Sequence, residues 1–146
     1  MAALHLRRAR FLLARFKSTA PRGVDVIGAP LCAGQPHAGV GSGPAALRGH
    51  GLLPQLAALG LDVADKGDVC SADVPAQLPP AGPGGLRHSA FIAAASQAIA
   101  HAVQDSMGRQ RLSLLLGGDH TVGLGSVAGA LRARPDTRVL WVDARA

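Results

Sequence analysis

Hydrophobic and polar positions along the chain fall into two alternating patterns. Short runs rich in Val, Ile and Leu predict strands over residues 24–27, 61–64, 111–116 and 138–142. Stretches in which apolar residues recur every three or four positions predict helices over residues 43–60, 86–107 and 121–134. Strands that alternate with helices usually pair in parallel. The chain is therefore predicted to have an α/β fold with a parallel sheet.

Glycine and proline divide this pattern. Residues 31–42 are glycine-rich and predict a long loop, which in a compact domain is usually functional or disordered. Gly43-Pro44 predicts the start of the first helix, and Pro54 predicts an interruption before its end at about Gly60. The stretch 75–85 has the composition of a surface linker.

Two of the apolar segments predict burial. Ile92, Ala95, Ile99, Val103 and Met107 share one face of the long helix, which should pack on the core. The run RLSLLL at 111–116 has little polar alternation and predicts a strand that is buried on both faces. We expect this strand and that helix face to be central to the fold.

Length and charge limit the kinds of partner. At 146 residues, 48% hydrophobic and 16% charged, the chain suits one globular domain with a real core. Its formal charge is +6, but six of the 15 basic residues lie in the first 22 positions, where no acidic residue occurs. The remaining nine equal the nine acidic residues. With no Tyr, three Phe and one Trp, the sequence predicts no nucleic-acid partner.

The basic residues define a leader over residues 1–22. Its sequence, MAALHLRRARFLLARFKST at the start, is Arg-rich, acid-free and ends in Ser and Thr, which is typical of a mitochondrial import segment. We expect residues 23–146 to form the folded domain and to lie in the mitochondrial matrix, or in the cytoplasm if the leader is a disordered basic tail. Since no run approaches ~20 apolar residues, no membrane span is predicted.

Cysteine usage points to no thiol-based site. Cys32 and Cys70 are the two cysteines, and they form no C-x-x-C pair. Neither a zinc site built on thiolates nor a disulfide framework is indicated. We expect both to be reduced thiols.

Two polar residues follow predicted strands at the edge where parallel sheets bind ligands. His120 comes shortly after the strand at 111–116, and Asp143 directly follows the strand at 138–142. If these strands are neighbours, an imidazole and a carboxylate approach each other and form half of a Mn²⁺ or Zn²⁺ site. The alternative is that His120 is a turn residue and that Asp143 caps the next element of the chain. Asp119 either orients His120 or closes the turn.

Several motifs occur together in the order and approximate spacing of a known family. They are V-I-G-A-P at 26–30, G-Q-P at 34–36, G-V-x-x-G-P-x-x-L-R at 39–48, G-D at 67–68, L-G-G-D-H at 116–120 and W-V-D-A at 141–144. The chain resembles the arginases over about residues 24–144. The G-Q-P loop and G-S-V-A-G at 125–129 are more similar to arginase than to agmatinase, and the leader resembles the mitochondrial type.

The resemblance implies a fold, a reaction and a metal. The fold would be the three-layer arginase-like one, with the carboxy-terminal half missing. The reaction would convert L-arginine and water to L-ornithine and urea at a two-manganese site, where a shared water ionises near neutral pH. His120 matches the first metal-binding His of the family and Asp143 the Asp of its D-A-H-x-D motif. The family forms homotrimers.

The sequence departs from the family after Ala144. Arg145 stands where a metal-binding His is expected, and its charged guanidinium offers no lone pair. The later metal ligands, the general acid/base His and the trimer-forming region do not follow. We therefore expect this truncated chain to be inactive alone and to bind Mn²⁺ weakly. The alternatives are a non-catalytic subunit that associates with full-length arginase, or an agmatinase-type ureohydrolase.

Part of the sequence also resembles a dinucleotide-binding motif. Residues 123–128 fit G-x-G-x-x-A and follow a predicted strand, with the acidic Asp143 20 positions after Gly123. In that fingerprint, however, the first glycine turns directly off the strand. Here residues 117–122 intervene and the glycines fall in the predicted helix, so this geometry counts against dinucleotide binding.

Overall fold

The computed structural model describes residues 21–36, 39–70 and 88–143. Within these ranges three parallel strands form one sheet in the order β2-β1-β3, with bounds β1 Val24–Ala29, β2 Val63–Asp68 and β3 Leu112–Gly117. The predicted linker at 75–85 and all of the predicted leader except residues 21 and 22 lie outside the described part of the chain.

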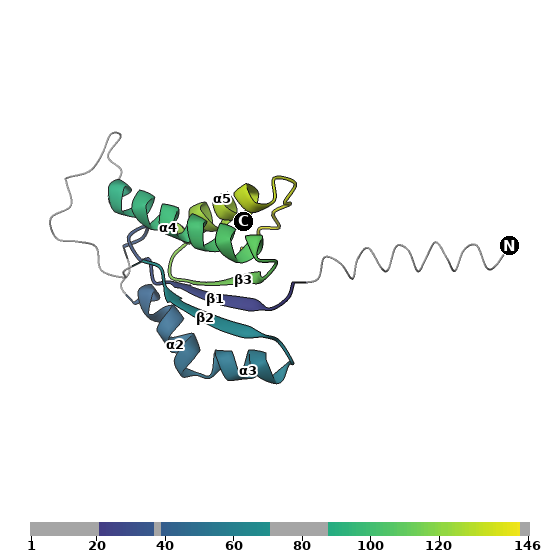
Figure 1. Cartoon of the computed structure of the whole chain (residues 1–146). Coiled ribbons are helices and arrows are strands. Elements are labelled where there is room, and N and C mark those ends of the chain that lie inside the picture. Colours follow the sequence, from purple (N-terminus) through teal and green to yellow (C-terminus); the bar gives the residue numbers. More distant parts are fainter. Residues whose placement is uncertain (1–20, 37–38, 71–87, 144–146) are drawn as a thin grey trace.

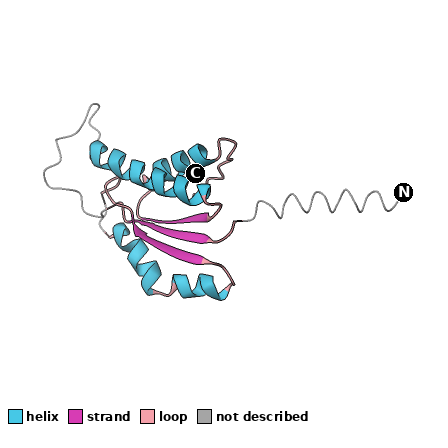
Figure 2. Ribbon diagram, in the orientation of Figure 1, coloured by secondary structure: helices cyan, strands magenta, loops and turns pink. Residues whose placement is uncertain are grey.

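Helices cover both faces of the sheet (Figure 1). On one face lie α2 (Gly43–Gly49) and α3 (Leu52–Ala58), and on the other lie α4 (Ser89–Gly108) and α5 (Val122–Ala133). A short 3₁₀ turn, η1 (Val40–Ser42), leads into α2. Figure 2 shows the resulting layers of helix, sheet and helix. The predicted α/β class with a parallel sheet is confirmed.

β1 is the central strand and carries much of the core. All six of its residues are buried, and Val26 and Ile27 are at most 1% exposed. Its register pairs Val24 with Val63 of β2 and with Leu112 of β3. A strand that is hydrogen-bonded on both sides and covered on both faces favours β-branched residues, which explains the V-D-V-I run. The predicted first strand is confirmed and extends to Ala29.

β2 lies further along the chain than predicted. The prediction placed it at 61–64, whereas the strand spans Val63–Asp68. Pairing with β1 begins at Val63, and the residue before it, Asp62, already accepts a hydrogen bond from the Val24 amide through its carbonyl at 2.7 Å. Its last four residues are exposed and mostly charged, which suits an edge strand. The second part of the strand, D-K-G-D, has no apolar pattern, so its extended structure is not predicted from sequence and depends on pairing with β1.

The first helical segment divides at a glycine and not at the proline. Helix α2 begins at Gly43 with Pro44 in its first turn, as predicted, and ends at Gly49. Gly51 has φ of 82°, a conformation that glycine adopts without strain, and α3 starts directly after it. Pro54 lies in the first turn of α3, where its missing N–H is no loss. The predicted break near Pro54 is therefore three to four residues too late.

α4 and α5 pack closely against each other on one face of the sheet. Ala95, Ile99 and Val103 of α4 are buried, which confirms the predicted apolar face over the described part of that helix. α5 approaches through two glycines, since a Cβ on Gly125 would lie 2.6 Å from the Ser96 carbonyl oxygen and one on Gly129 2.4 Å from that of Ala100. No helix in the described ranges is long and apolar enough to cross a membrane.

The last two predicted strands differ from expectation. β3 forms, but only Leu116 is buried and Leu112 is 51% exposed, so burial on both faces is wrong. Residues 138–142 form no strand, and Leu140 and Val142 are 88% and 86% exposed. In the described sheet β3 pairs with β1 alone, so β3 is an edge strand.

Candidate metal centre

Close backbone packing fixes the turn that carries His120. After β3, the Gly118 amide donates to the Ala29 carbonyl oxygen at 3.2 Å and the Asp119 amide to that of Leu31 at 2.8 Å. A Cβ on Gly118 would lie 2.0 Å from the Leu31 carbonyl oxygen, so glycine is required there. α5 then begins, with the Gly123 amide donating to the His120 carbonyl oxygen at 3.0 Å. His120 thus stands between the end of β3 and the first turn of α5.

Asp119 closes this turn and binds the glycine-rich loop. Asp119 is 8% exposed. Its carboxylate accepts hydrogen bonds from the Gly34 amide at 2.7 Å and from the Thr121 amide at 2.9 Å. The Thr121 hydroxyl donates to the same carboxylate. These partners lie on the loop and on the helix start. Of the two roles that the sequence left open, the geometry supports closure of the turn.

His120 and Asp143 lie together. The His120 Nε2 atom is 3.2 Å from Asp143 Oδ2, with side chains 61% and 22% exposed. The two residues meet although residues 138–142 form no strand, so the predicted approach occurs without the predicted strand pairing. The segment after α5 runs back along β3 and brings Asp143 beside the turn. This is the end of a parallel sheet at which side chains from several loops converge.

Trp141 joins the pair. Its ring centroid lies 6.4 Å from that of His120 at an interplanar angle of 35°, and its Nε1 donates to Asp143 Oδ2 at 3.4 Å. From sequence, Trp141 is recognisable only as part of the W-V-D-A motif. Its position two residues before Asp143 could have predicted the contact between the two side chains.

Open hollows flank His120 on two sides. One, of about 500 Å³, is lined by the Gly34–Pro36 part of the loop and by residues 118–121. The other, of about 510 Å³, lies towards Trp141 and the start of α5. A small polar molecule therefore has access to the imidazole and carboxylate from solvent.

No larger ligand cluster occurs in the part of the chain that the structure describes. Within it, no group of three or more His, Cys, Asp or Glu side chains is arranged to hold a metal ion. His50, His88 and His101 are exposed, and His37 and Arg145 lie outside the described residues. Cys32 and Cys70 form no disulfide, and burial, with the Asp68 charge, raises the pKa of the Cys70 thiol.

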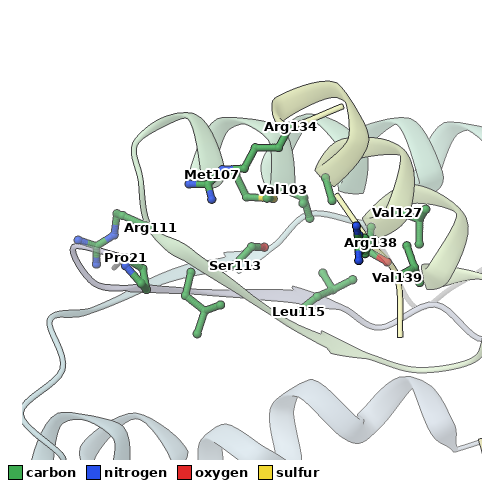
Figure 3. A pocket seen from close by; sticks show the side chains of 13 residues that line it. Pro21, Val103, Met107, Arg111, Ser113, Leu115, Val127, Arg134, Arg138 and Val139 are labelled. Carbon is green, nitrogen blue, oxygen red and sulfur yellow. The ribbon is translucent and has the colours of Figure 1, made fainter. Parts of the chain in front are cut away.

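A separate cavity lies beside the outer edge of β3 (Figure 3). It measures about 410 Å³ and is lined mainly by apolar side chains of β3, α4 and α5, with Arg111, Arg134 and Arg138 at its walls. None of its lining residues is His, Cys, Asp or Glu. It therefore offers no imidazole, thiol or carboxylate to a metal, so the candidate centre is the His120–Asp143 pair.

The opposite end of the sheet holds an ionic cluster that sequence analysis missed. The Asp25 carboxylate is fully buried and lies 2.6 Å from Arg111 Nε, 3.3 Å from an Arg109 nitrogen and 3.9 Å from Lys66 Nζ. Burial raises the pKa of Asp25, but side-chain hydrogen bonds, the strongest from Arg111, and the charge of Lys66 together outweigh burial, so the pKa is lowered. In the sequence, a carboxylate within the apolar run V-D-V-I was the signal that could have predicted a buried ion pair.

The glycines of the dinucleotide-like pattern have a packing role. Gly125 lies inside α5 and faces Ser96 and Ile99 of α4, and Gly123 faces the Trp141 ring. In a phosphate-binding loop the first glycine lies in the turn that directly follows the strand, and neither glycine lies in such a turn after β3. Helix packing therefore accounts for this pattern.

Fold and site together define a parallel α/β protein with an imidazole–carboxylate pair at the carboxyl end of its sheet. The family model that matches this chain is that of the arginase family, over residues 22–146. The chain belongs to the arginase family.

Individual relatives agree with this assignment. The chain is 43% identical over 129 residues to Arginase-1 of Sus scrofa, covering 88% of this chain and 38% of that protein. It is 38% identical over 126 residues to the arginase of Staphylococcus aureus, covering 86% and 42%. The native arginase structure from Bacillus caldovelox matches with a TM-score of 0.68 at 34% identity, covering 76% and 37%. The chain thus spans about two fifths of these relatives' length.

Proposed function

We propose that this chain forms part of the catalytic domain of an arginase-type hydrolase, which converts L-arginine and water to L-ornithine and urea. Membership of the arginase family supports this class of reaction. The observation that carries the site assignment is the 3.2 Å approach of His120 Nε2 to Asp143 Oδ2 at the carboxyl end of the sheet. We assign these two residues as manganese ligands.

The donor set fits one end of a manganese site. Imidazole nitrogen and carboxylate oxygen are both ligands that Mn²⁺ accepts. Two neighbouring ligands of a cation, each at about 2.0–2.2 Å, lie about 3 Å apart, which matches the observed separation of the two atoms. The pair is open to solvent on both sides, so water can complete the coordination.

The chain's own residues would bind the cation and orient its ligands. His120 and Asp143 hold the cation, and Asp119 fixes the turn that presents His120. The chemistry that manganese supplies in such sites is a lower pKa for water, which makes a hydroxide nucleophile available near neutral pH. This matters because a guanidinium carbon is a poor electrophile.

The 146-residue chain by itself should be a weak metal binder. The described residues offer no third His, Cys, Asp or Glu beside His120 and Asp143. Two protein donors are fewer than a hard cation usually takes. We infer that the isolated chain binds Mn²⁺ weakly and releases no urea from arginine.

A metal titration with matched variants tests this proposal. Mn²⁺ binding to the 146-residue chain should be weakened at least about 10-fold in His120→Asn and in Asp143→Asn, because each removes one of two donors. His101→Asn is the control, since His101 is exposed on α4. Urea should be absent with arginine and with agmatine alike. Equal Mn²⁺ affinity in all three variants would refute the ligand assignment, and urea release above a metal-free blank would refute the inactivity.

A non-catalytic role is the second candidate, and one observation favours it. Leu140 and Val142 are more than 80% exposed, and no described strand pairs with the outer edge of β3; a partner covers surfaces of this kind. The partner in this candidate is a full-length arginase. A tagged 146-residue chain that fails to retain full-length arginase in a pull-down would remove it.

A further inference from the structure

We infer that Trp141 is a positioning residue, which holds the Asp143 carboxylate and the His120 imidazole in one arrangement before a cation arrives. The inference rests on the proposed function, because it concerns the same two ligands. It is carried by the juxtaposition of three side chains from the turn after β3 and the segment after α5.

The indole contacts both members of the pair. Its Nε1–H is a donor only, and it points to Asp143 Oδ2 at 3.4 Å, the same oxygen that lies 3.2 Å from His120 Nε2. Its ring lies 6.4 Å from the imidazole centroid, within the range of tilted aromatic contacts. One side chain therefore restricts the rotation of a carboxylate and of an imidazole together.

Burial does not explain why Trp141 lies there. The residue is 57% exposed, and its neighbours Leu140 and Val142 are 88% and 86% exposed. Within the described residues, no backbone hydrogen bond fixes residues 138–142. The ring contact of Trp141 therefore joins this segment to the turn that carries His120, alongside the contact between His120 and Asp143.

Gly123 provides the place for the ring. A Cβ added at Gly123 would lie 2.8 Å from Trp141 Cη2 and 3.2 Å from Cζ3, so the edge of the indole occupies the space that a side chain would take. Gly123 belongs to the first turn of α5, three residues after His120. The glycine therefore couples the position of Trp141 to the helix that follows the imidazole.

Positioning of this kind lowers the cost of binding. Two ligands that are already aligned lose less side-chain freedom when a cation binds, so affinity rises without a new metal contact. Residues that orient metal ligands typically change affinity by about 10–100-fold when they are replaced. We expect an effect at the lower end here, because the indole hydrogen bond is long and partly exposed.

The variants separate the two contacts. Trp141→Phe keeps a ring and removes the N–H, and it should weaken Mn²⁺ binding several-fold. Trp141→Leu removes both and should weaken it about 10-fold. Gly123→Ala displaces the ring and should also weaken it, whereas Gly108→Ala should not, since no atom lies within 4 Å of the Cβ position at Gly108. Leu140→Ala is the control for lost apolar surface.

Free Mn²⁺ is measured by its electron paramagnetic resonance signal, which needs neither activity nor a fluorophore. The urea unfolding midpoint is measured in parallel. A positioning role predicts weaker binding with an unchanged midpoint, because Trp141 is more than half exposed. Unchanged affinity in Trp141→Leu, with normal binding by the unsubstituted chain, would overturn the inference and leave the proposed ligands standing.

A metal-free measurement tests the geometry independently. Trp141 is the one tryptophan in the chain, so the proton spectrum contains a single indole N–H resonance. A nuclear Overhauser effect between the indole and the His120 ring, lost in Gly123→Ala and kept in Gly108→Ala, is expected. Its absence would overturn the inference. If the unsubstituted chain fails to bind Mn²⁺ at all, the ligand assignment fails and the positioning role falls with it.

Discussion

Arg111 forms an ion pair with the fully buried Asp25, with Nε 2.6 Å from Oδ1, at the end of the sheet opposite His120. The same guanidinium reaches the Asp62 carboxylate at 2.5 Å and the carbonyl oxygens of Val24 and Asp62. It therefore joins the start of β1, the approach to β2 and the start of β3. Charges at this end hold the strands, while the polar groups at the other end form the candidate metal centre.

Replacing Arg111 by Met should destabilise the fold. The Asp25 charge would stay buried without its nearest partner, and such a loss is among the costlier single changes. We expect the melting temperature to fall by about 5–10 °C. Arg132→Met, at an exposed position of α5, is the matched control. Equal melting temperatures for the two variants would contradict the role of Arg111.

Asp25 should make stability depend on acid pH. Burial raises its pKa in the folded state, but side-chain hydrogen bonds, the strongest from Arg111, and the charge of Lys66 together lower the pKa below the ordinary value. Its contribution is therefore fully present above the unfolded pKa of about 3.9 and is lost as the pH falls through the lower folded pKa. Urea unfolding between about pH 6 and pH 2 should show a smaller loss in Asp25→Asn than in the unsubstituted chain.

The α4–α5 contact should not tolerate a methyl group. Gly125→Ala and Gly129→Ala place a Cβ within 2.6 Å of carbonyl oxygens of α4, so each should destabilise by about 1–3 kcal/mol in urea unfolding. Alanine would otherwise favour a helix by about 1 kcal/mol. Gly49→Ala in α2, where the added Cβ meets no atom within 4 Å, should be neutral or stabilising. A stabilising Gly125→Ala would refute the packing explanation.

Asp119 should hold the glycine-rich loop against the His120 turn. In Asp119→Ala the Gly34 and Thr121 amides lose their carboxylate acceptor, which should cost about 1–3 kcal/mol. Hydrogen exchange at the Gly34 amide should accelerate. Asp136→Ala, at an exposed position after α5, should change neither quantity. Unchanged exchange at Gly34 would show that Asp119 does not anchor the loop.

Residues 1–22 should direct import into mitochondria. The basis is an Arg-rich, acid-free sequence, which lies almost wholly outside the described residues. A fluorescent protein fused after residue 22 should collect in mitochondria. The same fusion with Gln in place of Arg7, Arg8, Arg10 and Arg15 should stay in the cytoplasm. Cytoplasmic fluorescence from both fusions would favour a basic tail.

The sequence by itself determined the local elements and the family motifs. A β-branched run located β1, apolar spacing located α4, and Gly43-Pro44 located the start of α2, because each of these signals acts on a few neighbouring residues. The sequence also singled out His120 and Asp143. It placed β2 too early and made residues 138–142 a strand, because strand formation depends on a partner that local pattern does not contain.

Only the tertiary structure decided which distant groups meet. It brought Arg111 to Asp25, Asp119 to Gly34, and Trp141 to the His120–Asp143 pair. These contacts join residues that chain folding, and not spacing along the sequence, places side by side. It also showed that Gly125 and Gly129 serve helix packing. Local sequence sets the backbone preference of each segment, whereas the sheet order and the helix contacts set which charges and rings share a site.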